Sequence, residues 1–259
     1  MKTFNQELKD VLVAEIIKHR EADQILQGTY EKEVNGIWKY CAVGCAIHSL
    51  NTKLGKNYKT NDHTVYETEF GIPVVLANLQ DKIFEGLTIE DSKTWPEKFM
   101  NAVPVNTDLS LVWPKFAVWL LADETDGVRK FITDPEVLKA FDRVVKLYQK
   151  QVAGEIVTKA DWEAAAYATY AASVSVYAVA YAAVAADAAD AAASAAYAAA
   201  YAAYAAAYVA VAAVAADAAY STSEATSSAA SAAYSADAAR HIHYAKCAAK
   251  LIEILKSPK

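Results

Sequence analysis

The feature that most constrains the fold of this chain is a long C-terminal stretch without helix-breaking residues. Neither glycine nor proline occurs between Gly154 and Pro258, and 46 of the 90 residues from Ala160 to Ala249 are alanine. Alanine loses the least side-chain entropy on entering a helix, so the intrinsic helix propensity is high along the whole stretch. We therefore predict that the chain is helical from about Asp161 to Lys256, with Thr158 or Asp161 capping the start.

Larger side chains recur at coiled-coil intervals along this alanine background. The first series is Tyr167, Tyr170, Val174, Tyr177, Tyr181 and Val184, the second is Asp187, Asp190, Ser194, Tyr197, Tyr201, Tyr204, Tyr208 and Val211, and the third is Asp237, His241, Tyr244, Ala248, Leu251 and Leu255. Steps of three and four residues keep one stripe facing a partner helix. We predict that this region packs against other helices and joins copies of the chain into a homo-oligomer, either as one continuous rod or as hairpins that reverse near residues 221–228.

Glycine and proline are scattered through the first 154 residues, and apolar residues there recur at helical spacing. The pattern predicts an all-α fold with two parts, a compact helical domain over residues 1–155 and the helical packing region over residues 156–259. One small β-hairpin is expected near residues 30–40, because Asn35-Gly36 is a strong turn signal. Further predicted helices run from Val74 to Gly86, Ile89 to Ala102, Leu109 to Leu121 and Pro135 to Gln151.

The distribution of charge excludes several kinds of partner. No Lys or Arg occurs between Lys159 and Arg240, so the chain has no extended basic face and we expect no nucleic-acid partner. Residues 191–216 are uncharged and long enough to cross a bilayer, but they are mostly alanine with four tyrosines on one stripe. We therefore expect no membrane partner.

The three cysteines and the N-terminal residues indicate the compartment. Cys41, Cys45 and Cys247 are an odd number without the spacing of a disulfide framework, and the first residues lack the pattern of a signal peptide. Free thiols are typical of reducing compartments. We predict a cytoplasmic protein, located in the host cytoplasm if its source is viral.

Several short motifs lie between Trp38 and Leu121. They are Cys41 to His48 (CAVGCAIH), then His63 with Tyr66 and Glu67, then Gly71-Ile72-Pro73, then Asp81 to Leu87 (DKIFEGL), and finally Trp95-Pro96 with Phe99. This region, about a third of the chain, resembles a family of uncharacterised phage and prophage proteins that carry a CAVGC-x-[IL]-H segment and often an alanine-rich tail. The resemblance implies an origin in a virus or mobile element, and it implies no particular chemistry.

Three hypotheses compete for the cysteine and histidine segment. Zinc could be bound by Cys41, Cys45, His48 and His63, although the spacing differs from that of common structural sites. In the second hypothesis Cys45 is a nucleophile, with His63 as its base and Glu67 orienting the imidazole. The third hypothesis makes these residues part of the core, which is the commonest role for such side chains on an apolar helix.

The sequence lacks the phosphate-binding and catalytic signatures of well-defined enzyme classes, which favours binding over catalysis. We predict that the protein acts as a phage-type accessory, or counter-defence, protein that sequesters a small host-derived ligand such as a nucleotide immune signal, with no required cofactor. The candidate ligand-binding residues are His48, His63, Tyr66, Glu67 and Trp95. Two alternatives are a Cys45-dependent and His63-dependent hydrolase or transferase, and a scaffold that binds a host protein through the tail.

Overall fold

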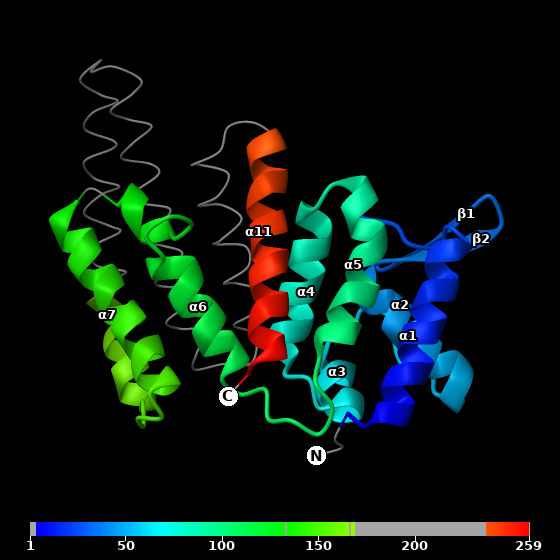
Figure 1. Cartoon of the computed structure of the whole chain (residues 1–259), viewed down its shortest axis with the longest axis horizontal. Helices are drawn as coiled ribbons and strands as arrows, with labels where there is room; N and C mark the ends of the chain where they lie inside the picture. The colour runs from blue at the N-terminus through cyan, green and yellow to red at the C-terminus, as the bar shows by residue number, and fades with distance from the viewer. Residues whose placement is uncertain (1–3, 133, 166, 169–236, 259) are drawn as a thin grey trace. The chain divides into compact units, whose positions relative to one another are not determined.

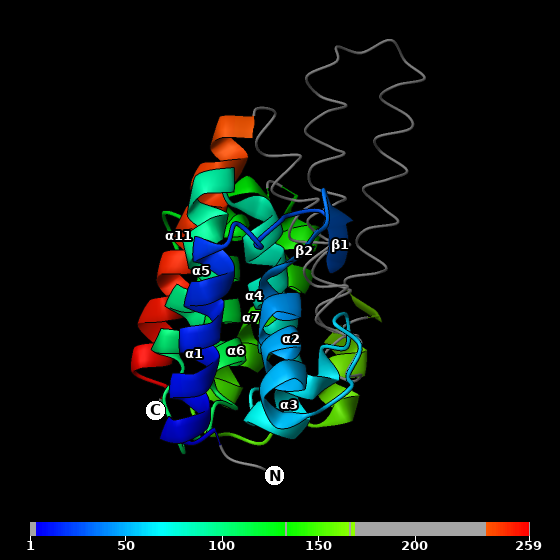
Figure 2. The same cartoon turned by 90° about the vertical axis from the view of Figure 1, so that its right-hand side faces the viewer.

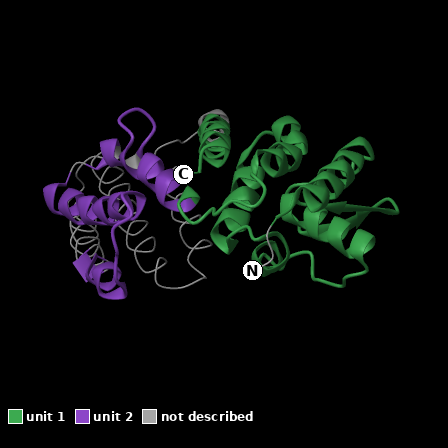
Figure 3. Ribbon diagram, turned by 60° about the horizontal axis from the view of Figure 1, so that its bottom comes forward, with its two compact units in different colours: residues 1–112, 240–259 green, residues 113–239 purple. Residues whose placement is uncertain are grey.

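The computed structural model describes residues 4–132, 134–165, 167–168 and 237–258 (Figure 1). It is mostly helical with one antiparallel hairpin, so the predicted fold class is confirmed. The chain forms two compact units, residues 1–112 with 240–259 (unit 1) and residues 113–239 (unit 2) (Figure 3). This division does not coincide with the predicted boundary near residue 155.

Unit 1 is a helical core with a hairpin attached. Its elements are α1 (Gln6–Glu21), β1 (Glu31–Val34), β2 (Ile37–Tyr40), α2 (Ala42–Leu54), α3 (Thr64–Phe70), α4 (Val74–Gly86), α5 (Ile89–Ala102) and most of α11 (Asp237–Lys256). Helix α1 packs on α2 and α5, both of which also pack on α4, and α3 packs on α4 (Figures 1 and 2). The helices α4 and α5 have the predicted bounds, because their apolar residues repeat regularly between clear start and stop signals.

The hairpin forms at the predicted turn. Strands β1 and β2 pair with Val34 opposite Ile37, and the two turn residues Asn35 and Gly36 have φ angles of 54° and 79°. Positive φ at both central residues is the requirement of a type I′ turn, which Asn-Gly satisfies with little strain. The hairpin leads directly from Tyr40 into α2 (Figure 2).

The C-terminal helix α11 contacts α4 within unit 1. The ring of Tyr244 lies where a Cβ atom on Gly86 would stand, and His241 Nδ1 donates to the Gly86 carbonyl oxygen at 3.0 Å. Tyr244, Leu251 and Leu255 are buried, as the third series of large residues predicts. Among the described residues, the Tyr244 ring contacts Gly86 of α4, which the series alone did not predict.

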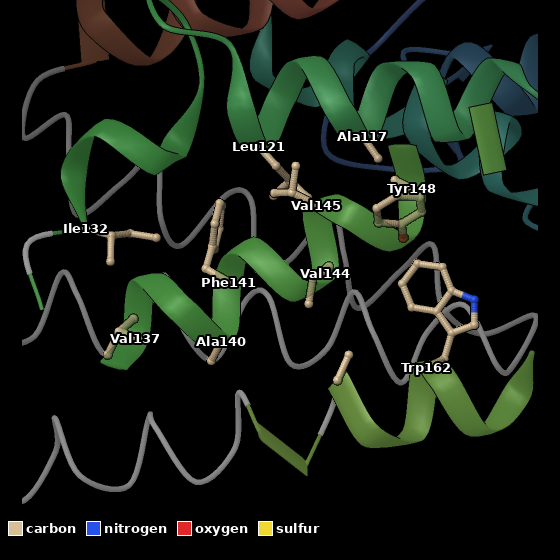
Figure 4. Packing of buried hydrophobic residues seen from close by; sticks show 11 residues of the cluster. Ala117, Leu121, Ile132, Val137, Ala140, Phe141, Val144, Val145, Tyr148 and Trp162 are labelled. Atoms are coloured by element: carbon tan, nitrogen blue, oxygen red, sulfur yellow. The ribbon is translucent and has the colours of Figure 1, made fainter. Parts of the chain in front are cut away.

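Unit 2 contains α6 (Val112–Ala122) except for its first residue, the short 3-10 helix η1 (Val128–Phe131) and α7 (Pro135–Val152). The buried face of α7 forms a cluster with α6, and Figure 4 shows Phe141 and Val145 within it. Trp162 joins this cluster, with its ring centroid 4.8 Å from that of Tyr148. The predicted boundary near residue 155 therefore lies inside a packed unit, because the first turn of the tail contributes to its core.

The start of the tail helix matches its prediction. Thr158 Oγ1 accepts from the Asp161 backbone N–H at 3.2 Å, and Asp161 Oδ2 accepts from the Thr158 backbone N–H at 2.8 Å. This reciprocal capping satisfies backbone donors that a helix start leaves free.

Tyr167, the first residue of the predicted seam, is 77% exposed. The remaining residues of the first two series, and the proposed reversal at residues 221–228, lie outside the described residues.

No helix in the described part of the chain is both long and apolar enough to cross a membrane.

Candidate functional site

Five polar side chains from three helices and their caps meet inside unit 1, and we call them the buried polar cluster. They are Cys41, His63, Tyr66, Gln80 and Asp81. Cys41 and His63 are the N-cap residues of α2 and α3, Tyr66 lies within α3, and Gln80 and Asp81 are neighbours in α4.

Distances and electrostatic interactions place these groups together. His63 Nε2 lies 3.4 Å from Asp81 Oδ2. Burial raises the pKa of the Cys41 thiol well above its ordinary value, and the nearby Asp81 carboxyl group adds to this effect. Burial also raises the pKa of Tyr66 well above its ordinary value, with Gln80 opposing the shift and Cys41 and Asp81 reinforcing it. Both groups are therefore neutral at physiological pH.

The cluster contains polar atoms that the described protein does not satisfy. His63 Nε2, Tyr66 Oη, both amide atoms of Gln80 and Asp81 Oδ1 are buried without a hydrogen-bond partner among the described residues. Each buried polar atom left without a partner costs about 1–3 kcal/mol. Native folds keep few such atoms, so their concentration at one point requires an explanation such as a bound ligand or ordered water.

Exposure changes across the cluster. Tyr66 and Gln80 are fully buried, whereas the side chains of His63 and Asp81 are 12% and 11% exposed. The ring of Tyr30, which is itself 36% exposed, meets the His63 ring edge-on at a centroid distance of 5.7 Å. The cluster therefore has a closed end at Gln80 and Tyr66 and an end near the surface at His63 and Asp81.

The CAVGC segment is explained by packing. Cys41 Sγ caps α2 by accepting from the Gly44 backbone N–H at 3.3 Å. A Cβ atom on Gly44 would overlap the Tyr30 carbonyl oxygen, so only glycine fits there. The Cys45 thiol is fully buried and donates to the Tyr40 carbonyl oxygen at 3.9 Å.

These contacts weigh against the nucleophile hypothesis. Burial raises the pKa of Cys45, so the thiol stays protonated, whereas a nucleophilic cysteine requires the thiolate. Among the described residues, His63 Nε2 lies beside Asp81 Oδ2 and His63 Nδ1 lies 3.2 Å from the Asn61 carbonyl oxygen. Asp81 thus occupies the position beside His63 that the sequence analysis assigned to the half-buried Glu67.

His48 belongs to a different group of side chains. Its ring stacks on Tyr40 at a centroid distance of 4.4 Å and meets His19 at 5.3 Å, and we call these three rings the His-Tyr stack. Across the described ranges, no group of three or more His, Cys, Asp or Glu side chains is arranged to hold a metal ion. The four candidate zinc ligands are therefore not gathered at one point.

Trp95 packs beside the cluster, but its ring has no exposed face. Its ring is 1% exposed and packs against Phe99, and its Nε1 donates to the Gln80 carbonyl oxygen at 2.9 Å. It therefore fixes the backbone of Gln80 and does not offer a free face for stacking a ligand.

Two members of the cluster, Gln80 and Asp81, were missed as site residues by the sequence analysis. A signal for Gln80 was present, because it lies four residues after Leu76 and four before Phe84, on the buried face of α4. Core positions of an amphipathic helix are usually apolar, so a polar residue at such a position is a signal of a possible site.

The chain matches no protein-family model, no curated protein and no solved structure.

Proposed function

We propose that this chain is a non-catalytic binding protein that captures a small polar molecule at the buried polar cluster. The supporting observation is the set of five buried polar atoms without a partner among the described residues. A buried polar atom without a well-formed hydrogen bond costs about 1–3 kcal/mol, so several of them at one point weaken the fold unless something pairs with them. A ligand that pairs with these atoms recovers that free energy as affinity.

The phage resemblance extends this proposal to the biological role. We propose sequestration of a host-derived ligand in the cytoplasm, with a nucleotide immune signal as one candidate. The tail then serves to join copies of the chain. A cysteine-dependent hydrolase is the less favoured alternative, because the Cys45 thiol is buried and its pKa is raised.

The direct test is native mass spectrometry of the purified full chain, which reports the subunit number and any retained small molecule. The same measurement on Gln80→Leu and on Gln149→Leu gives a matched pair, because Gln149 is exposed on α7 and undergoes the same chemical change. We expect a retained molecule in the unchanged chain and in Gln149→Leu, and its loss in Gln80→Leu.

Retention by all three proteins would place the ligand elsewhere. If none of them retains a molecule, calorimetry with small metabolites decides, and the absence of any binding would remove the proposed function.

A further inference from the structure

The hydrogen-bonding groups of the buried polar cluster define the chemistry that can pair with them. The Gln80 amide offers two N–H donors and a carbonyl acceptor side by side. Its side chain interacts with the Tyr66 hydroxyl group, but neither amide atom makes a hydrogen bond of good geometry with the described residues. Asp81, the next residue, adds the free acceptor Oδ1, and Tyr66 Oη can either donate or accept. The unpaired groups of the cluster thus include both donors and acceptors.

The charge of the cluster disfavours an anionic ligand. Its members include no Lys or Arg, and within the described part of the chain the ion-pairing partner of Asp81 is His63. A phosphate group here would lie beside a carboxyl group without the guanidinium or ammonium donors that normally bind phosphate. Burying a phosphate beside the Asp81 carboxyl group is unfavourable, because the cluster has no Lys or Arg to compensate the added negative charge.

We propose that the cluster recognises an uncharged planar group with an N–H donor and an acceptor on one edge, such as a nucleobase, a lactam or an amide. The Gln80 amide pairs with such an edge through two parallel hydrogen bonds, as glutamine does with adenine in nucleic-acid recognition. Asp81 Oδ1 accepts from a ring or exocyclic N–H group of the same edge. The inference rests on the proposed function and assigns its ligand class.

The surroundings of Gln80 hold its backbone in place. The Trp95 indole N–H donates to the Gln80 carbonyl oxygen at 2.9 Å, and both residues are buried. A backbone fixed before binding reduces the entropy lost on binding, which increases both affinity and discrimination. The end of the cluster at Asp81 and His63, beside Tyr30, is the end nearer the surface.

The experiment is calorimetric titration of the full chain with two sets of probes. The first set is adenosine, guanosine, cytidine and uridine, and the second is inorganic phosphate, ribose 5-phosphate and methylammonium. We expect at least one nucleoside to bind and the second set not to bind. Gln80→Leu should weaken nucleoside binding by about 5- to 150-fold, the range of one bidentate base contact, whereas Gln149→Leu should leave it unchanged.

Asp81→Asn separates the two ligand classes by the direction of its effect. If a nucleoside N–H donates to Oδ1, removing the negative charge weakens binding, because hydrogen bonds to charged acceptors are the stronger ones. If a phosphate occupies the cluster, the same change tightens binding. Circular dichroism of each variant confirms that it is folded before its affinity is compared.

The outcomes distinguish this inference from the proposed function. Binding of phosphate, ribose 5-phosphate or methylammonium that is lost in Gln80→Leu would overturn the ligand class and leave the proposed function standing. Nucleoside binding that Gln80→Leu does not alter would overturn the role of the cluster. If no probe binds and no molecule is retained in native mass spectrometry, the cluster holds only water and both proposals fail.

Discussion

At the scale of single residues, Gln80 presents a conflict between stability and binding. Its amide is fully buried, and neither of its polar atoms makes a hydrogen bond of good geometry in the described part of the protein. Replacing an unsatisfied buried amide by an apolar side chain of similar size removes the desolvation penalty without leaving a hole. We predict that Gln80→Leu raises the free energy of unfolding of the ligand-free protein by about 1–3 kcal/mol, measured by urea denaturation.

The control for this prediction is Gln149→Leu, which makes the same change at an exposed site and should shift stability by less than about 0.5 kcal/mol. A clear loss of stability in Gln80→Leu would show that the amide has partners in the ligand-free protein. The cluster would then be structural.

The buried cysteines lead to a second prediction. All three cysteine side chains are buried, and burial raises the pKa of both Cys41 and Cys45. Since thiolates are the reactive species, we expect Ellman's reagent at about pH 8 to label the native chain only as fast as it unfolds. A thiol introduced by Ser257→Cys, at an exposed position, supplies the fast reference rate. Labelling of Cys45 at that reference rate would support the enzyme hypothesis instead.

At the scale of secondary-structure elements, sequence patterns predicted those helices and turns whose formation depends only on residues within the element. Helix α4 and the Asn35-Gly36 hairpin were both predicted, because apolar spacing and turn chemistry are local properties. The buried polar cluster was only partly predictable. His63 and Tyr66 were selected, but their proximity to Asp81 depends on how α3 packs on α4, which no local pattern encodes.

The packing of α11 on α4 leads to a third prediction. Gly86 leaves room for the Tyr244 ring, so a methyl group there overlaps ring atoms. We expect Gly86→Ala to lower the free energy of unfolding by about 1–3 kcal/mol, the usual range for an overpacked core. Because the overlap requires both side chains, the effect of Gly86→Ala should be smaller in a Tyr244→Ala background. Additive effects of the two substitutions would show that these helices are not in contact.

The His-Tyr stack joins α1, β2 and α2 and leads to a fourth prediction, on pH. Burial lowers the pKa of both His19 and His48 below 6.5, although Glu15 acts in the opposite direction on both. As the pH falls through 6.5, the unfolded chain binds protons that the folded chain does not, so stability present above this pH is lost below it.

Substitution of His48 by phenylalanine keeps a ring on Tyr40 but removes one titrating group. We expect a smaller loss of unfolding free energy between about pH 7.5 and pH 5.5 for His48→Phe than for the unchanged chain, measured by urea denaturation. Equal losses in the two proteins would assign the pH dependence to other groups.

At the scale of the whole molecule, the two ends of the chain belong to one unit. Residues 240–259 cluster with residues 1–112, whereas the start of the tail contributes Trp162 to the core of unit 2. Sequence composition changes abruptly near Gly154, but the boundaries of a compact unit depend on which residues are buried together and not on composition. The alanine-rich stretch is therefore an internal insertion with respect to unit 1, and removing everything after residue 160 would delete part of the core of that unit.

This connectivity leads to the last prediction, a comparison of two deletions. Tyr244, Leu251, Ile254 and Leu255 of α11 are buried. At about 1.5–3 kcal/mol for each buried side chain, their loss amounts to about 6–12 kcal/mol, comparable with the stability of a domain. We therefore expect a chain that ends at residue 236 to lose cooperative unfolding, as followed by circular dichroism.

The matched deletion removes only residues 169–236 and joins the flanking residues by a flexible Gly-Ser linker of about 20 residues, whose mean span is about 25 Å. This chain keeps α11, so it should unfold cooperatively and retain binding at the cluster. If the tail joins the copies, its mass in light scattering should fall to that of a monomer. Cooperative unfolding of both deleted chains would show that α11 is dispensable to unit 1. An unchanged oligomer in the internal deletion would show instead that subunit contacts lie outside the alanine-rich stretch.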